Sequence, residues 1–122
     1  AVLTLRKIHK LQKDYGHAVV KEESEALKVK LVIEKLETPP SDLAIMPVYV
    51  FDAEIFEALK QIKPGVGNEV QLTDAIQKLV EWGKLVGAIK LEDDEIRLDV
   101  GTPETYSEAL KLSYELSLKG LL

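Results

Sequence analysis

One carboxylate near the carboxyl end of the chain has the setting of a metal ligand. Asp99 lies in an apolar stretch, residues 96–100, that ends at Gly101, and Thr102-Pro103-Glu104 follows. Threonine is a favourable N-cap, proline suits the first helical position, and an acid suits the first turn of a helix. The pattern predicts a strand that presents Asp99 at a strand–helix corner, where open α/β sheets bind ligands. A carboxylate there can hold a divalent metal over a phosphate but cannot build a metal site alone, and it equally fits a satisfied structural carboxylate.

A second pair of charged residues, Glu34 and Lys35, ends a predicted strand and precedes a proline-rich loop. A carboxylate can accept hydrogen bonds from sugar hydroxyls, and a lysine ammonium is a point charge that suits a phosphate. The same two residues also fit an exposed ion pair at a strand end. Local sequence leaves both interpretations open.

Three other segments have both a ligand-binding and a structural interpretation. Gly16 would let a ligand approach the backbone closely, or it is an ordinary bulge glycine. Asp74 follows Thr73 at a helix start, where the acid suits the helix dipole and the threonine or its neighbour caps the helix. The Gly-Val-Gly turn at 65–67 follows a helix and a proline, and no Lys-Ser/Thr comes after it, which favours a plain turn over a phosphate loop.

Composition excludes several classes of function. The 122 residues are 46% hydrophobic, enough for the core of one domain, and the net charge of −5 argues against a nucleic-acid-binding surface. No cysteine is present, which removes disulfides, thiolate nucleophiles and cysteine-based zinc sites. The apolar runs are only strand length, so we expect no membrane span, no signal peptide and a cytoplasmic protein. Abundant Lys and Glu resemble thermophile usage.

An alternation of strands and helices must position the candidate residues. The hydrophobic patterns predict strands at 1–5, 15–21, 27–34 and 43–51, helices at 53–62 and 72–83, strands at 85–91 and 95–100, and a final helix at 103–118. Pro47 suggests a bulge or an edge within the fourth strand. The order predicts an α/β fold, a mixed β-sheet with flanking helices, in which residues 1–122 form a single unit.

Taken in order, six short segments resemble the sugar-1-phosphate nucleotidylyltransferases. They are Tyr15-Gly16, Glu34-Lys35, Pro40-Ser41-Asp42-Leu43-Ala44, Tyr49-Val50-Phe51, the run 69–76 and the run 99–103. Within the family, residues 71–76, Gln-Leu-Thr-Asp-Ala-Ile, are most similar to the glucose-1-phosphate uridylyltransferases, with thymidylyltransferases close behind. The resemblance covers nearly the whole chain and rests on the order and spacing of the segments.

The resemblance implies a Rossmann-like nucleotidyltransferase fold and a transfer that depends on magnesium (Mg2+). In such a transfer the sugar 1-phosphate attacks the α-phosphorus of a nucleoside triphosphate, which yields a nucleotide sugar and pyrophosphate. The reaction needs positioning, and cations that offset the phosphate charges.

The resemblance also implies which residues bind substrate. In chain order they are Gly16, Glu34, Lys35, Ile45 and Tyr49. Gly16 would meet the sugar through its backbone, Glu34 would hold sugar hydroxyls, and Lys35 would hold the sugar phosphate. Ile45 and Tyr49 would line the sugar side, and Asp99 would be one of two magnesium-binding aspartates.

Two departures and one absence stand beside this resemblance. Leu36 follows Lys35 where the family usually has proline, and Pro47 stands where a glycine is common ahead of Tyr49. Nothing in residues 1–15 matches the family's glycine-rich loop, its base contacts or its other metal aspartate. We therefore expect a carboxy-terminal half, a fragment that begins at Ala1 and leaves the nucleoside triphosphate to the missing half.

Two main hypotheses follow from the sequence. In the first, the chain is the sugar-phosphate-binding part of a glucose-1-phosphate uridylyl- or thymidylyltransferase and is inactive alone. In the second, it is a non-catalytic binding or assembly subunit of the same fold; a plain α/β domain of common ancestry is a third. Half a sheet exposes an edge and an apolar face, so we expect the isolated chain to form a homo-oligomer.

Overall fold

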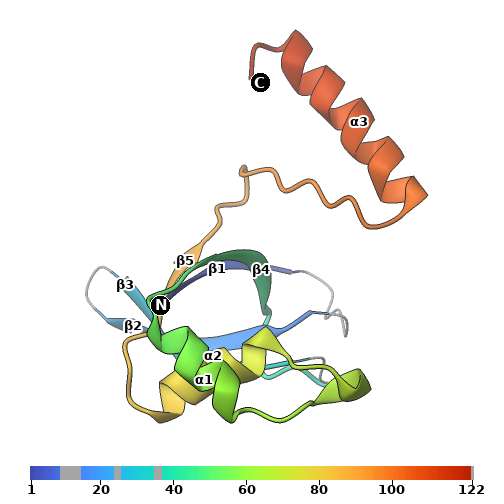
Figure 1. Ribbon diagram of the computed structural model, residues 1–122. Helices are drawn as coiled ribbons and strands as arrows, with labels where there is room; N and C mark the ends of the chain where they lie inside the picture. The colour runs from blue at the N-terminus through green and yellow to red at the C-terminus, as the bar shows by residue number, and fades with distance from the viewer. Residues whose placement is uncertain (9–14, 24–25, 35–36, 122) are drawn as a thin grey trace. The chain divides into compact units, whose positions relative to one another are not determined.

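The computed structural model describes residues 1–8, 15–23, 26–34 and 37–121 (Figure 1). The chain divides into two compact units, Ala1–Glu92 and Asp93–Leu122. The first unit holds the sheet and two α-helices, and the second holds one long helix with the segment that leads into it. The prediction that residues 1–122 form a single unit stays a prediction.

The described strands of the first unit form one closed sheet. They are β1 (Val2–Lys7), β2 (His17–Glu23), β3 (Ala26–Ile33), β4 (Leu43–Val50) and β5 (Gly87–Lys90). Their order is β1-β4-β2-β3-β5, and β5 returns to β1 to complete a barrel. β5 runs parallel to β1, whereas the other pairings are antiparallel. The predicted mixed sheet is confirmed, and its closure is a feature that the sequence pattern did not indicate.

Pro47 produces the predicted bulge in β4. Leu3 pairs with Tyr49, but the next residue, Thr4, pairs with Met46, so two residues of β4 are skipped in the register. Proline has no N–H to give to a strand ladder, which confines it to edges and bulges. The bulge therefore sets the direction of β4 just before Tyr49.

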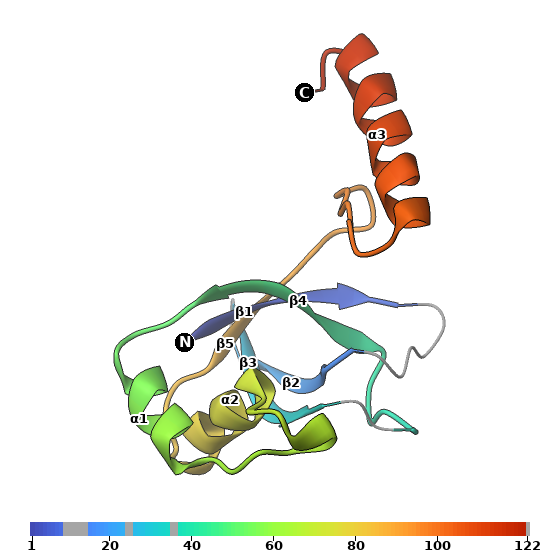
Figure 2. The same ribbon diagram turned by 45° about the vertical axis from the view of Figure 1, so that its right-hand side comes forward.

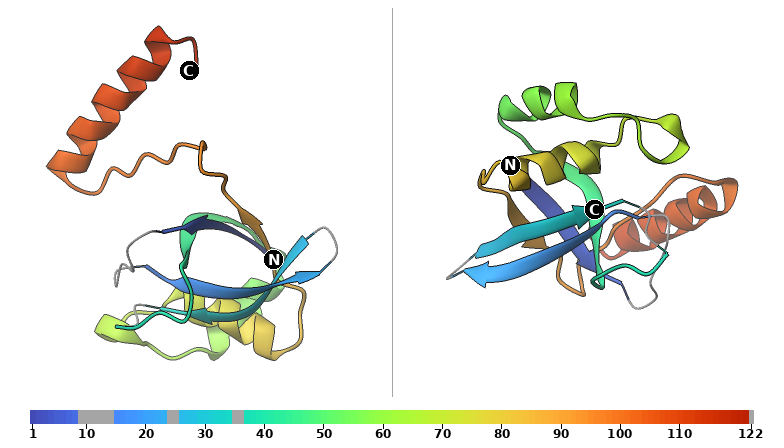
Figure 3. Two further views of the ribbon diagram at one scale, coloured as in Figure 1. Left: turned by 180° about the vertical axis from the view of Figure 1, so that it is seen from behind. Right: turned by 90° about the horizontal axis from the view of Figure 1, so that it is seen from below.

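The β2–β3 hairpin places the carboxyl end of β3, just before Glu34. The two strands lie side by side in both views of Figure 3, with a register that runs from His17–Ile33 to Glu23–Ala26. β3 ends at Ile33, so Glu34 follows directly beyond the strand. The predicted strand boundaries at this point are confirmed within one residue.

Two helices cover one side of the sheet. α1 (Glu54–Gln61) and α2 (Leu72–Glu81) lie side by side below the strands in Figures 1 and 2, with the short 3-10 turn η1 (Val66–Asn68) between them in the chain. Asp52 Oδ1 accepts a hydrogen bond from the Glu54 N–H at 3.1 Å, which holds the start of α1. Gly83, with φ of +71°, follows α2 in the left-handed conformation typical of helix ends.

The hydrophobic core of this unit lies between the helices and the sheet. Leu3 and Leu5 alternate on β1 and are fully buried, as are Ile76 and Leu79 on one face of α2. Each such side chain contributes about 1.5–3 kcal/mol relative to an exposed position. Apolar residues recur every second position in β1 and every third or fourth position in α2, so each element has one apolar face, and these faces turn toward the core.

The second unit is built on α3 (Pro103–Leu118), whose bounds are those predicted from sequence. Thr102 Oγ1 accepts a hydrogen bond from the Thr105 N–H at 3.2 Å, and Thr105 Oγ1 accepts one from the Thr102 N–H at 3.0 Å. This reciprocal capping box fixes the helix start. None of the described α-helices is both long and apolar enough to cross a membrane.

The strand predicted at 95–100 is wrong. Residues 95–100 have no strand structure, and Ile96, Leu98 and Val100 are exposed. A strand exists only through hydrogen bonds to a neighbour, and the pairings among the described residues provide none for this segment. The apolar residues do alternate in this segment, but no neighbouring strand pairs with it among the described residues.

Candidate functional site

Glu34 lies at the centre of a cluster formed by three separate segments. Gly16 is buried just before β2, and a Cβ added to it would lie 2.9 Å from Glu34 Oε2 and 3.3 Å from Ile45 Cδ1. The Gly16 carbonyl also accepts a hydrogen bond from the Ile45 N–H at 2.8 Å. The absence of a side chain at Gly16 is thus required by the close approach of the Glu34 carboxylate. Three residues predicted from sequence meet here.

Tyr49 on β4 lies within the electrostatic influence of Glu34. Partial burial and the negative charge of Glu34 both raise the pKa of the Tyr49 hydroxyl above its ordinary value. Its ring stacks on Phe51, with ring centroids 5.4 Å apart and planes 15° from parallel. At ordinary pH, Tyr49 therefore provides a neutral hydroxyl and an apolar ring beside the carboxylate.

Thr73 is a member of the cluster that sequence reasoning missed. Its Oγ1 donates a hydrogen bond to Glu34 Oε2 at 2.6 Å, and the residue is only 6% exposed. Capping by Thr73 is therefore wrong: α2 begins after Gln71, with no side-chain cap. The sequence did contain a sign of this role, because Thr73 lies three residues before Ile76 on the buried face of α2. A polar residue in that position needs a partner.

The Glu34 carboxylate keeps capacity for a ligand. One oxygen accepts from Thr73, and no other hydrogen bond to the carboxylate comes from the residues that the structure describes. A carboxylate has about four acceptor positions. Glu34 can therefore accept from two hydroxyls of a polyol while Thr73 holds it in place.

Two predicted site residues cannot be assigned to this cluster. Lys35 lies outside the described residues. Asp99 belongs to the second unit, where its Oδ2 lies 2.5 Å from Arg97 Nη2. The ion pair agrees with the structural interpretation left open by the sequence, in which Asp99 is a satisfied carboxylate.

The donor set for a divalent metal is incomplete in the described part of the chain. No group of three or more His, Cys, Asp or Glu side chains gathers there in a metal-binding arrangement. Asp99 supplies a single carboxylate and faces a guanidinium. A metal held by Asp99 would need further ligands from elsewhere, so the described residues alone do not fit a complete metal site.

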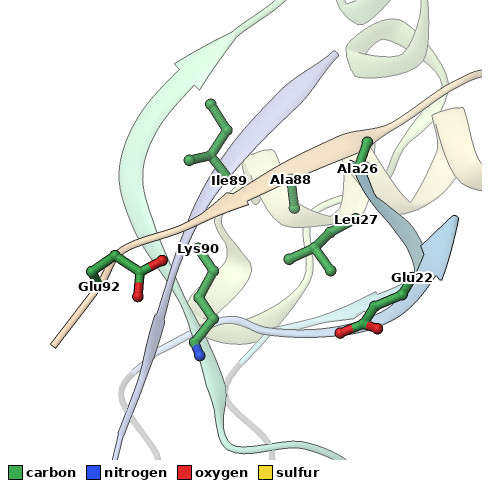
Figure 4. Close-up of a pocket in the computed structure, with 7 residues that line it drawn as sticks. All are labelled: Glu22, Ala26, Leu27, Ala88, Ile89, Lys90 and Glu92. Atoms are coloured by element: carbon green, nitrogen blue, oxygen red, sulfur yellow. The ribbon is translucent and has the colours of Figure 1, made fainter. Parts of the chain in front are cut away.

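A separate cavity of about 470 Å³ opens between the β2–β3 hairpin and β5 (Figure 4). Leu27 and Ala88, which are register partners, lie close together in it. Its charged lining residues are Glu22, Lys90 and Glu92. The cavity shares no residue with the Glu34 cluster, and among the described residues its lining includes no side chain held by a buried hydrogen bond as Glu34 is by Thr73. The cluster is therefore the stronger candidate for a ligand site.

The fold and the cluster define an α/β domain in which the Glu34 carboxylate, hydrogen-bonded by Thr73, lies at the end of β3. Residues 1–115 match the family model described as nucleotidyl transferase, and the chain belongs to this family. The sequence resemblance to nucleotidylyltransferases is confirmed at that level.

Curated relatives and solved structures agree with this assignment. The chain is 37% identical over 95 residues to the UTP–glucose-1-phosphate uridylyltransferase AglF of Haloferax volcanii, covering 78% of this chain and 37% of the relative. It is 38% identical over 90 residues to a Pseudomonas aeruginosa UTP–glucose-1-phosphate uridylyltransferase, covering 72% and 31%. A crystal structure of apo UDP-glucose pyrophosphorylase superposes with a TM-score of 0.82 at 30% identity, covering 93% of this chain and 42% of that one. The α/β nucleotidyltransferase fold is confirmed, and the chain spans well under half the length of these relatives.

Proposed function

We propose that this chain is the sugar-phosphate-binding, carboxy-terminal part of a nucleotidyltransferase that acts on glucose 1-phosphate. UTP or dTTP is the proposed second substrate, bound outside this chain. Relatives named as UTP–glucose-1-phosphate uridylyltransferases support the substrate class. The likeness to UDP-glucose pyrophosphorylase complexed with UDP-glucose, with a TM-score of 0.79, supports the same site type.

One observation carries the proposal. Gly16, Glu34 and Ile45 come from three separate segments and pack together, and the charge of Glu34 also acts on Tyr49 of the strand that carries Ile45. A carboxylate flanked by an aromatic ring and a backbone without a side chain suits a sugar, which offers hydroxyls and an apolar face. An exposed ion pair at a strand end would not require Gly16 to make room for Glu34.

In the proposed reaction this chain positions the sugar phosphate. Glu34 accepts hydrogen bonds from sugar hydroxyls, Tyr49 and Ile45 line the sugar, and the Lys35 ammonium pairs with the phosphate. An oxygen of the sugar 1-phosphate forms a bond to the α-phosphorus of the triphosphate. The bond from that phosphorus to the bridging oxygen breaks, and pyrophosphate leaves. Fixing the attacking group in this way is a major source of rate enhancement in such transfers.

We also propose that the complete enzyme binds a divalent metal, with Asp99 as one of its ligands. Mg2+ is the metal that we propose, since it would offset the charge on the phosphates. Asp99 would first have to separate from Arg97, and the remaining ligands would come from outside the described residues.

Titration of glucose 1-phosphate into the chain tests the proposal. Calorimetry should show binding by the unaltered chain, and Glu34→Ala should weaken it about tenfold or more, because a charged hydrogen-bond acceptor is worth about 1.5–3 kcal/mol. Glu22→Ala, which removes a carboxylate from the separate cavity, is the matched control and should bind normally. Absence of binding, or equal binding by Glu34→Ala, would contradict the proposed site.

The isolated chain should not release pyrophosphate. UTP or dTTP mixed with glucose 1-phosphate and the chain should give no turnover above the buffer blank, because the nucleotide side is proposed to lie elsewhere. Turnover by the chain alone would contradict its role as a part of the enzyme.

A further inference from the structure

We infer that Gln77 is a positioning residue for Glu34, and that α2 holds the sugar-binding carboxylate through two side chains one helical turn apart. This inference rests on the proposed function, since it assigns a role within that site. Among the described residues, Gln77 makes no hydrogen bond to the predicted substrate-binding side chains. It acts on the backbone that carries Glu34.

The contact in question joins a helix side chain to a strand backbone. The Val32 N–H donates a hydrogen bond to Gln77 Oε1 at 2.8 Å. Val32 is 3% exposed and lies two residues before Glu34. A buried backbone N–H needs a partner, so this bond constrains where β3 ends.

On one side β3 pairs with β2, where Ala18 is the register partner of Val32. On its other side β5 would normally provide the partner for the Val32 N–H, but the described pairing with β5 does not reach Val32. In the described pairings β3 meets β5 at Leu27 and Lys28, close to its other end. Further along, the Val29 N–H donates to the Val86 carbonyl at 2.8 Å, before β5 begins. On the side of β3 away from β2, the side-chain amide of Gln77 therefore takes the place of a neighbouring strand at Val32.

Gln77 and Thr73 work on the same short segment. They are four residues apart on α2, so they lie on the same side of the helix, which packs against β3. Thr73 holds the Glu34 carboxylate at 2.6 Å and Gln77 holds the Val32 backbone at 2.8 Å. The carboxylate is therefore fixed at its tip and two residues before its base. A small displacement of a binding group is costly, since a sugar hydroxyl must meet it in one geometry.

Binding of glucose 1-phosphate to Gln77 variants of the chain tests this inference. Gln77→Met keeps the side-chain length but removes the acceptor, and it should weaken binding about tenfold. Gln77→Glu keeps an acceptor oxygen and should bind within about threefold of the unaltered chain. If Gln77→Met does not fold, Gln77→Asn replaces it, because the shorter amide stays polar but withdraws its oxygen from Val32.

The decisive readout is the dependence on Glu34. If Gln77 acts through Glu34, then Gln77→Met should add little to the loss already caused by Glu34→Ala. Losses that multiply in the double variant would overturn the inference, as would normal binding by Gln77→Met. In both cases binding that depends on Glu34 would leave the proposed function standing. Failure of the unaltered chain to bind glucose 1-phosphate would overturn both.

Discussion

Thr73 on α2 donates a hydrogen bond to Glu34, 39 residues earlier in the chain, at 2.6 Å. This bond ties the carboxylate at the end of β3 to the helix that covers the sheet. Gly16 lies against both side chains, since its added Cβ would approach Glu34 Oε2 and Thr73 Cγ2 to 2.9 Å each. The cluster is thus a packed structure in which each residue depends on the others.

Gly16→Ala should both destabilise the chain and impair ligand binding. No real Cβ is accommodated at 2.9 Å, so Glu34 or Thr73 must move, and overpacking of this kind costs about 1–3 kcal/mol of unfolding free energy. Denaturant unfolding and glucose 1-phosphate titration measure the two effects.

Gly87→Ala is the matched control for that substitution. A Cβ there would meet its nearest neighbour, the Leu27 carbonyl oxygen, at 3.8 Å, an ordinary contact. Its unfolding free energy should stay within about 0.5 kcal/mol of the unaltered chain. A Gly16→Ala chain as stable as Gly87→Ala, with unchanged binding, would contradict the described packing.

Tyr49→Phe should extend the stability of the chain to higher pH. Burial and the charge of Glu34 raise the pKa of Tyr49 in the folded chain, so folding is favoured while the hydroxyl stays protonated. That contribution is complete below the ordinary tyrosine pKa of about 10 and is lost as pH rises through the raised folded value. Phenylalanine cannot ionise and keeps the stacking on Phe51.

Unfolding free energies measured across alkaline pH check this prediction. The unaltered chain should lose stability above about pH 10 more steeply than Tyr49→Phe. Tyr106→Phe, at an exposed position on α3, serves as the control and should follow the unaltered chain. Parallel curves for Tyr49→Phe and the unaltered chain would contradict the raised pKa of Tyr49.

Much of the fold was predictable because it depends on local signals. Thr102 and Pro103 mark the start of α3, and Pro47 marks the bulge in β4. Barrel closure was not predictable, because it depends on β5 returning to β1 across about 80 residues of sequence. The strand expected around Asp99 failed for a related reason, since apolar alternation does not say whether a neighbour exists.

In the candidate site, too, the residues could be named from sequence, but their contacts with distant parts of the chain could not. Glu34 and Tyr49 could be named through resemblance, yet neither sequence position indicates the other as a neighbour. Thr73 was assigned to a cap because that is the usual role of threonine at a helix start. Only the path of β3 past α2 reveals that its hydroxyl has a longer-range partner.

Self-association of the chain remains a prediction, and α3 offers a way to test it. Four large apolar residues spaced four apart on this helix are at least 53% exposed: Tyr106, Leu110, Tyr114 and Leu118. Such a stripe favours association with another apolar surface. Light scattering should show a dimer, and Leu110→Glu with Tyr114→Glu should give a monomer. A monodisperse monomer of the unaltered chain at high concentration would contradict the prediction.

The location of bound glucose 1-phosphate tests the central claim most directly. Amide chemical shifts of the labelled chain, followed by NMR during titration, report where the ligand sits. We predict the largest shifts at Gly16, Glu34 and Tyr49, with Ala88 and Lys90 of the separate cavity unchanged. Shifts confined to Ala88 and Lys90, or no saturable shifts at all, would contradict the assignment of the Glu34 cluster as the sugar-phosphate site.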